Sequence, residues 1–306
     1  MDERTLTNLR GHGWTPGETL GAGMEGTVID LSSDEVAKVW HRRERADLID
    51  LVRFGAALGK SSVPFRTSRA IELLEGEGLP VTIEQKVHGK PLRLDNLVNP
   101  PIVSDHESRL IGDALAGLAQ AIDPGLAVLP ILPGEPAFTN DVSFANNLAD
   151  LAQRRFDAHP ELLRTRIGDI DQLLGALLER LRALPMVSPA SFIHGDLIPA
   201  NVLIEDDQVA GVVDFGFMTT LGDPEFDAAI TASIFDMYGT NARESERVLS
   251  SAFLLRFGHD PVRYGLYRAA YAVVTNSYFG ADDTDGHFLW CASMLEREDV
   301  RNAIRS

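Results

Sequence analysis

The sequence has a single cysteine, Cys291, and no long apolar run. One cysteine excludes an intrachain disulfide and is typical of a reducing compartment. A membrane-spanning helix needs about 18 consecutive apolar residues, and no run approaches that length. The start, MDERTLTNLR, lacks the apolar segment of a secretory signal. We therefore expect a cytoplasmic protein with no membrane partner.

Basic residues are also scarce. The chain has 28 Lys and Arg against 45 Asp and Glu, a formal net charge of −17. Residues 1–86 contain 11 basic and 14 acidic residues, whereas residues 87–306 contain 17 basic and 31 acidic residues. An acidic surface repels nucleic acids and attracts cationic molecules, although it also promotes solubility. The charge argues against a nucleic-acid partner, and no obligate protein partner is evident.

The apolar periodicity changes near residue 86. Before this point we predict strands at 69–74 and 79–86 and one helix at 41–58. Beyond residue 89 the pattern is helical, with helices predicted at 104–122, 141–157, 168–184, 223–238, 242–257 and 261–279. Ser104 and Glu107 form a capping box at the first of these. The sequence therefore predicts an α+β protein with a small β-rich lobe (1–86) and a larger, mainly helical lobe (87–306).

Residues 194–216, HGDLIPANVLIEDDQVAGVVDFG, contain polar side chains in a spacing that suits phosphoryl transfer. This chemistry requires a carboxylate to orient a hydroxyl and oxygen ligands to hold Mg²⁺ against a triphosphate. Asp196 is the candidate catalytic carboxylate, and Asn201 and Asp214 are hard oxygen donors that suit Mg²⁺. The HGD triplet alone would favour an acidic turn with a structural histidine, His194. The complete set favours phosphoryl transfer.

Two short apolar runs, 202–204 and 209–213, surround an acidic turn in the same segment. They predict a β-hairpin. Asn201 would precede its first strand and Asp214 would follow its second. Both candidate metal ligands would then lie at the same end of the hairpin.

A second motif lies near the N-terminus, where LGAGMEGTV at 20–28 matches G-x-G-x-x-G-x-V. Glycines let the backbone approach phosphates closely, and a nearby lysine can reach them as a point charge. The candidate nucleotide-binding residues are Gly21, Gly23, Gly26, Val28 and, in VAKVW, Lys38.

The alternative interpretation of this motif is a dinucleotide-binding turn. That turn requires a buried strand before the glycines and a helix at their end. Here the preceding residues, GHGWTPG, make a poor strand, and the following residues, TVIDL, favour a strand. We therefore predict a strand–glycine loop–strand arrangement.

These motifs together resemble the aminoglycoside phosphotransferase family, the small-molecule branch of the protein-kinase-like fold. The similarity includes the glycine loop, Lys38, HGDLIPAN at 194–201, VVDFG at 212–216 and GDPEFD at 222–227. It implies a bilobal kinase-like fold with the nucleotide between the lobes. It also implies ATP as the donor, with GTP left open, and Mg²⁺ as the metal.

The resemblance also implies individual roles. Asp196 would be the catalytic base or hydroxyl-orienting group, Asn201 and Asp214 would bind Mg²⁺, and Lys38 would contact the phosphates. Asp227 would brace the catalytic loop through backbone hydrogen bonds, a structural role.

The segment VTIEQKVHG at 81–89 resembles the hinge between the two lobes, placed at 83–89. There the carbonyl of Glu84 and the N–H of Lys86 would meet adenine. An ordinary edge strand is the equally weighted alternative.

The sequence departs from kinase patterns in two places. Only eight steps separate Asp214 from Gly222, without the A-P-E of a peptide-binding activation segment. A protein substrate is therefore not expected. The family also pairs its lysine with a glutamate on a helix, and the acids available there are Glu44, Asp47 and Asp50. The sequence leaves open which of these three replaces that glutamate.

We expect the acceptor to be the hydroxyl of a small cationic molecule such as an aminoglycoside antibiotic. Its ammonium groups would pair with carboxylates of the acidic second lobe. The candidate contacts are Asp236, Asp282, Asp283 and Asp285. Two alternatives stay open: a metabolic hydroxyl kinase acting on homoserine, choline, a sugar or an amino acid, and a pseudokinase-like module that binds nucleotide without turnover.

Overall fold

The first part of the chain folds into a five-stranded antiparallel sheet. The computed structural model describes residues 3–23, 25–94, 99–121, 129, 131–139, 141–187 and 190–306. The strand order is β1-β2-β3-β6-β5, and the bounds are β1 Thr19–Ala22, β2 Gly26–Asp30, β3 Glu35–Trp40, β5 Ala70–Leu73 and β6 Val81–Gln85. β1 and β2 form the predicted strand–glycine loop–strand unit, in which Met24 lies outside the described residues.

Helices cover both faces of this sheet. On one face, Ile29, Val39 and Ile83 form a small core with Leu9 of α1 (Glu3–Gly11). On the other face, Trp40 packs into the main core with residues of α2 (Arg45–Leu58). Burying each such side chain stabilises the fold by about 1.5–3 kcal/mol. The strand β3, which includes Lys38, is therefore held firmly from both sides.

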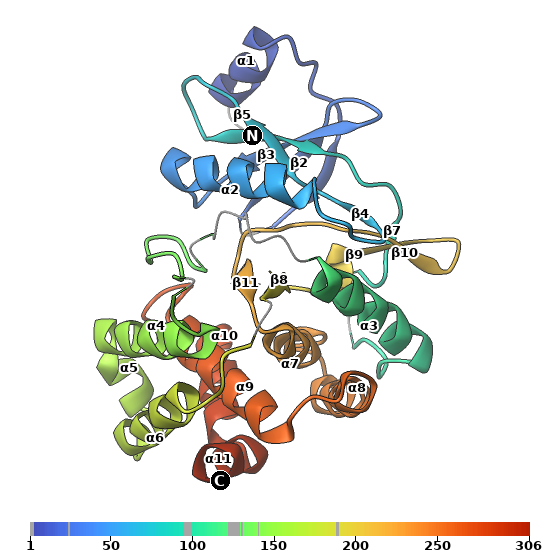
Figure 1. The fold of residues 1–306 in the computed structure, drawn as a ribbon. Coiled ribbons are helices and arrows are strands. Elements are labelled where there is room, and N and C mark those ends of the chain that lie inside the picture. Colours follow the sequence, from blue (N-terminus) through green and yellow to red (C-terminus); the bar gives the residue numbers. More distant parts are fainter. Residues whose placement is uncertain are drawn as a thin grey trace.

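The second part of the chain is mainly helical and lies below the sheet (Figure 1). Its centre is α9, whose residues from Tyr264 to Thr275 are all buried, and which packs against α4, α7, α10 and α11. The helices are α3 Asp105–Gln120, α4 Phe144–Ala158, α5 Pro160–Arg164, α6 Ile170–Arg182, α7 Pro224–Ile234, α8 Ala242–Phe257, α9 Pro261–Thr275, α10 Gly286–Glu296 and α11 Glu298–Arg305. The predicted capping box at Ser104 and Glu107 is confirmed.

Two small sheets lie between these parts. One has the order β4-β10-β9-β7 (Arg66–Thr67, Gln208–Val212, Val202–Glu205 and Lys90–Pro91), and β9 and β10 form the predicted hairpin. The other pairs β8 (Ser191–Ile193) with β11 (Thr220–Gly222). β4 pairs in parallel with β10, so the first of these sheets joins segments from both sides of residue 86. The architecture confirms the α+β fold with a β-rich and a helical part.

Three predicted helices are shorter than expected where they approach the space between the two parts. The helix predicted at 41–58 begins at Arg45, the one at 223–238 ends at Ile234, and the one at 261–279 ends at Thr275. In each case, some of the residues that were expected to belong to the helix line the cavity described below instead. Within the described ranges, no helix is both long and apolar enough to cross a membrane.

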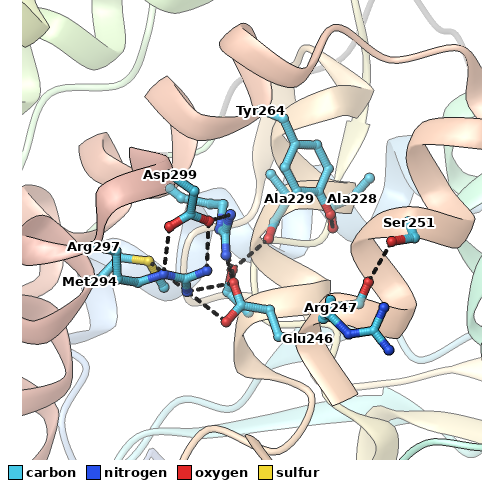
Figure 2. A network of polar contacts seen from close by, with 11 residues as sticks. Ala228, Ala229, Glu246, Arg247, Ser251, Tyr264, Met294, Arg297 and Asp299 are labelled. Atoms are coloured by element: carbon cyan, nitrogen blue, oxygen red, sulfur yellow. Dashed lines mark hydrogen bonds and ion pairs between the residues drawn. The ribbon is translucent and has the colours of Figure 1, made fainter. Parts of the chain in front are cut away.

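A buried ionic network holds the C-terminal helices together (Figure 2). Glu246 of α8 is only 5% exposed and forms ion pairs with Arg268 of α9 and with Arg297, just before α11. Asp299 contacts the same two arginines at 3.1 and 2.8 Å, and Ser233 of α7 donates to Glu246 at 3.2 Å. The network therefore fixes α7, which supports the loop after β8, relative to three neighbouring helices.

Candidate active site

The loop after β8 begins with a neutral, buried histidine. His194 is fully buried, and its Nε2 lies 2.9 Å from the carbonyl oxygen of Val213. The N–H of Asp196 donates to Nδ1 of the same ring at 3.2 Å. Nδ1 therefore accepts, and Nε2 has the proton that it donates to Val213. Burial lowers the pKa of His194 to about 4, which keeps the ring uncharged near neutral pH.

The same loop is anchored from α7. The carboxylate of Asp227 accepts hydrogen bonds from the N–H groups of His194 and Gly195 at 2.9 and 2.8 Å. Burial raises the pKa of Asp227 to about 6. Gly195 has φ +79°, and a Cβ there would lie 2.3 Å from the carbonyl oxygen of Met218. Only glycine fits at this position, and the backbone that aims Asp196 is therefore rigid.

Asn201 and Asp214 meet at one end of the β9–β10 hairpin, as the sequence predicts. Asn201 Nδ2 donates to the carbonyl of Asp196 at 2.9 Å, which leaves its Oδ1 as the atom suited to a metal. The N–H of Val213 donates to the carbonyl of Asn201 at 2.9 Å. The catalytic loop and the two predicted metal ligands thus share one hydrogen-bonded unit.

Asp214 forms an ion pair with Lys38 across the cleft. It has φ +66°, and its N–H donates to Ser68 Oγ at 3.1 Å. Burial would raise the pKa of Asp214, but Lys38 outweighs burial and holds that pKa below its usual value. For Lys38, burial would lower the pKa, but Asp214 and then Glu84 outweigh it. Both members of the pair are therefore charged.

The glycine loop lies directly beside this pair. Val28 of β2 is paired with Lys38 of β3 in the sheet register. A Cβ on Gly26 would lie 2.4 Å from the carbonyl oxygen of Val39, so this glycine is required for close packing. Around Gly21 and Gly23 an added Cβ would meet no described atom within 4 Å. These two positions give a phosphate room to approach the backbone.

The donor set fits a magnesium ion shared with a nucleotide. Asn201 offers an amide oxygen and Asp214 a carboxylate, and Mg²⁺ commonly takes one or two protein oxygens together with phosphates and water. Among the described residues, no cluster of three or more His, Cys, Asp or Glu side chains could hold a metal by itself. The arrangement is therefore suited to a metal that arrives with a phosphate.

A cavity of about 550 Å³ opens in front of Asp196. Its described lining includes the acids Glu25, Asp196 and Asp236 and the bases Arg42 and Arg93. Its wall also contains many aromatic rings, namely Phe217, Phe235, Tyr238, Tyr271, Tyr278, Phe279 and His287. Asp196 therefore faces a volume large enough for a small organic acceptor.

Comparison with known proteins identifies the family. The model of the phosphotransferase enzyme family matches residues 17–264, which is most of the chain. The chain belongs to this family. The family comprises phosphotransferase enzymes, and the kinase-like fold agrees with that assignment.

Similar solved structures support the fold. A thermostable aminoglycoside phosphotransferase mutant in complex with AMP-PNP and hygromycin B has a TM-score of 0.67 at 16% identity and covers 100% of this chain and 98% of its own. Wild-type aminoglycoside 2′-phosphotransferase IIIa with GDP has a TM-score of 0.60 at 17% identity, with coverage of 98% and 97%. A phosphotransferase from Streptomyces rimosus with ADP and streptomycin has a TM-score of 0.54 at 17% identity, with coverage of 88% and 97%.

One curated relative is named for homoserine as its acceptor, and not for an aminoglycoside. A homoserine kinase from Granulibacter bethesdensis is 40% identical over 85 residues. The match covers 24% of this chain and 27% of that protein. It therefore compares only about a quarter of each sequence.

The structure departs from the hinge prediction for this phosphotransferase. The N–H of Lys86 donates to the carbonyl of Asp34 at 2.8 Å, and its ammonium pairs with Asp30 at 2.7 Å. Adenine could use the Lys86 N–H only if that backbone bond broke. The side chain of Glu84 is buried on the Lys38 side of the sheet and accepts from Thr82 Oγ1 at 2.9 Å.

None of the three helix acids proposed for Lys38 forms an ion pair with it within the described residues. Asp50 pairs with Arg53 at 3.0 Å, Glu44 is exposed before α2, and Asp47 lies in the first turn of that helix. The expectation that one of them replaces the helix glutamate is therefore wrong in this structure. Lys38 forms its ion pair with Asp214 instead.

Only one of the four proposed acceptor carboxylates lines the cavity, and it is Asp236. Asp282 and Asp283 line a separate shallow depression beside α5. Asp285 caps α10, accepting from the N–H groups of His287 and Phe288 at 2.9 and 3.1 Å. Acidity in the sequence could not distinguish a capping residue from a ligand.

Sequence reasoning missed Glu25. It lies inside the glycine motif, where its carboxylate pairs with Arg43 of the same part of the chain at 3.2 Å and also accepts from the hydroxyl of Tyr278, in the helical part, at 3.3 Å. The glycine loop therefore contacts the acceptor wall directly. The only signal available was a charged residue within a loop otherwise suited to phosphate.

Proposed function

We propose that this chain is an ATP- and Mg²⁺-dependent O-phosphotransferase acting on a hydroxyl of a small cationic molecule. One observation supports this most strongly. Asp196 faces the 550 Å³ cavity, while its loop is hydrogen-bonded to both Asn201 and the segment before Asp214. A hydroxyl placed in the cavity would therefore point toward a nucleotide held by Lys38.

Each residue of the site has a separate role in phosphoryl transfer. Asp196 accepts a hydrogen bond from the acceptor hydroxyl and takes its proton as the oxygen bonds to the γ-phosphorus, while the bond to the β–γ bridging oxygen breaks. Lys38 moves from Asp214 to the phosphate oxygens. Asn201 Oδ1 and Asp214 would hold Mg²⁺, and the metal would supply positive charge to offset that of the phosphates.

The cavity lining favours an acceptor with a cationic group attached to an apolar surface. Asp236 Oδ2 is buried and has no hydrogen-bond partner among the described residues, and a buried acceptor atom of this kind calls for a donor. Glu25, by contrast, already contacts Arg43 and Tyr278. The aromatic wall adds cation–π attraction and apolar contact. Aminoglycosides are the leading class because related structures bind hygromycin B, kanamycin and streptomycin.

A metabolic amino-alcohol acceptor is the second candidate. The partial match to a homoserine kinase supports it. The catalytic residues would be the same in both cases, and only the cavity contacts would differ. A pseudokinase-like module is disfavoured because Lys38, Asp196, Asn201 and Asp214 are all present.

The acceptor is tested by measuring acceptor-dependent ADP release with Mg-ATP. The panel includes hygromycin B, kanamycin, streptomycin, homoserine, choline and an uncharged sugar. We expect turnover of at least one cationic alcohol, and an Asp236→Asn variant should raise its KM about tenfold while kcat changes less. Turnover of the uncharged sugar alone would contradict the cationic assignment, and no acceptor-dependent turnover would favour the nucleotide-binding module.

A further inference from the structure

The helix beside Lys38 turns an apolar face toward it. Leu51, Phe54 and Leu58 of α2 are buried, and the ring of Phe54 lies 6.3 Å from that of Phe215, the residue after Asp214. The helix acid Asp50 pairs with Arg53 on the outer side. In this chain α2 therefore supplies packing, and no described carboxylate of α2 contacts Lys38.

A different acid occupies the space between α2 and the sheet. Lys38 of β3 is paired with Thr82 of β6, and Glu84 lies two residues further along the same strand. Side chains two residues apart in a strand lie on the same face, so Lys38 and Glu84 share the face that covers the cleft. Glu84 also borders a small void together with Phe54 and Phe215.

Hydrogen bonds hold the Glu84 carboxylate in place. The indole N–H of Trp40 donates to Thr82 Oγ1 at 2.8 Å, and that hydroxyl donates to Glu84 Oε1 at 2.9 Å. Glu84 is only 8% exposed. The ammonium of Lys38 lies 3.9 Å above the Trp40 ring, at the start of the same chain of contacts. A buried carboxylate fixed in this way can act on a neighbouring ammonium with little screening.

We propose that Glu84 on β6 is the acid that positions Lys38 for the nucleotide, in place of an acid on α2. The inference rests on the proposed kinase function. In the structure Lys38 is paired with Asp214. Once Asp214 binds Mg²⁺, Lys38 must leave it and yet stay charged and oriented. Glu84, on the same face of the sheet as Lys38, supplies the second carboxylate that makes this exchange possible.

The structural alternative is a protonated Glu84 that only accepts from Thr82. Burial raises the pKa of Glu84, while Lys38 opposes that rise. The two roles differ in charge, and a substitution of equal shape therefore distinguishes them. Glu84→Gln removes the charge but can still accept from Thr82.

The test measures binding of a non-hydrolysable ATP analogue with Mg²⁺ by calorimetry, KM for ATP, and Tm. We expect Glu84→Gln to weaken analogue binding and to raise KM about tenfold, with little change in Tm. Asp50→Asn, which removes one negative charge from α2, should leave all three values unchanged. Glu84→Asp keeps the charge and should recover part of the affinity.

Wild-type affinity in Glu84→Gln, or an equal loss in Asp50→Asn, would overturn the proposal. If Glu84→Gln does not fold, Glu84→Asp decides: an affinity equal to wild type would contradict a positioning role that depends on reach. Failure of the kinase function itself looks different. In that case the wild-type protein would show no acceptor-dependent turnover with Mg-ATP, whether or not it binds the analogue.

Discussion

Asp196 is the proposed catalytic residue, and the backbone around it is held by hydrogen bonds that involve His194, Asp227 and Asn201. Asp196→Asn keeps the shape but cannot accept a proton. We expect it to retain nucleotide affinity and to lose at least about 100-fold in kcat, the contribution typical of a general base. The matched control is Asp283→Asn, which removes a carboxylate outside the cavity. Near-wild-type turnover in Asp196→Asn would show that its role is misassigned.

A second residue-scale prediction concerns Glu225 near the start of α7. Burial, and then the negative charge of Asp223, raise the pKa of Glu225 from 4.5 to about 8. The folded state therefore holds a proton that the unfolded state has already released, and stability falls as pH rises from 4.5 to 8. Above pH 8 the carboxylate of Glu225 is ionised in both the folded and the unfolded state, and the loss of stability has reached its full size.

Glu225→Gln removes this titration. Urea unfolding at pH 5 should give nearly equal stabilities, whereas at pH 8 the variant should be more stable by about 3 kcal/mol. Arg263 lies 3.6 Å from the carboxylate and would lose a partner, which opposes the gain. A variant less stable than wild type at both pH values would show that Glu225 is ionised and paired.

For single residues, the sequence predicted the position of a side chain where the spacing of a motif determines its geometry. The placement of Asn201 and Asp214 at one end of a hairpin could be predicted, because the two apolar runs between them determine it. Asp282, Asp283 and Asp285 could not be placed, because a loop sequence does not determine which cavity it borders. Glu84 was assigned to the hinge through its carbonyl, and strand alternation alone could not show that its side chain faces Lys38.

At the scale of elements, the turn between β8 and η1 (Pro199–Asn201) determines where the catalytic carboxylate points. Gly195 has a positive φ and lies against the carbonyl of Met218. Gly195→Ala therefore adds both backbone strain and a clash. We expect a loss of at least about 2 kcal/mol in stability, measured by urea denaturation, together with a lower kcat.

Gly134→Ala is the control for this prediction. Gly134 has φ +77°, yet an added Cβ there meets no described atom within 4 Å. It should show only the backbone cost of about 1 kcal/mol, with unchanged kcat. Equal effects of the two substitutions would mean that the contact with Met218 is unimportant.

The residues at which helices end were harder to predict from the sequence than the presence of the helices. Helices predicted to continue to 238 and 279 end at Ile234 and Thr275, because Asp236, Tyr238 and Tyr278 line the cavity instead. Their sequences are compatible with helix. Tertiary contacts of the following residues determine the end, and those contacts join segments far apart in the chain.

At the scale of the whole molecule, the helical part must hold α7 steady under the catalytic loop. The Glu246 network performs this task through Arg268 and Arg297 (Figure 2). Glu246→Ala removes the buried carboxylate from two largely buried guanidinium groups and leaves them only the half-exposed Asp299 as a shared partner. We expect a loss of about 3 kcal/mol or more in unfolding free energy.

The matched control is Glu244→Ala on the same helix. Its pair with Arg247 is largely solvent-exposed, so the urea midpoint should not change. Similar midpoints for the two variants would contradict a structural role for the network. This network could not be predicted from the sequence, because its charged members come from α8, α9 and the start of α11.

The two-part architecture itself was predictable from the glycine motif, the catalytic loop and the change in periodicity near residue 86. The parallel pairing of β4 with β10 was not, because two short segments about 140 positions apart have no shared pattern. The boundary at residue 86 stays a prediction.

The central claim is that Asp196, Asn201, Asp214 and Lys38 form one phosphotransfer site. The most direct measurement follows Mg-ATP and a cationic alcohol by ³¹P NMR with the wild-type protein and with Asp196→Asn. We predict a new phosphate monoester resonance that grows with ADP in the wild type and is absent in the variant. Equal monoester formation by the variant, or ATP converted only to inorganic phosphate by the wild type, would contradict the claim.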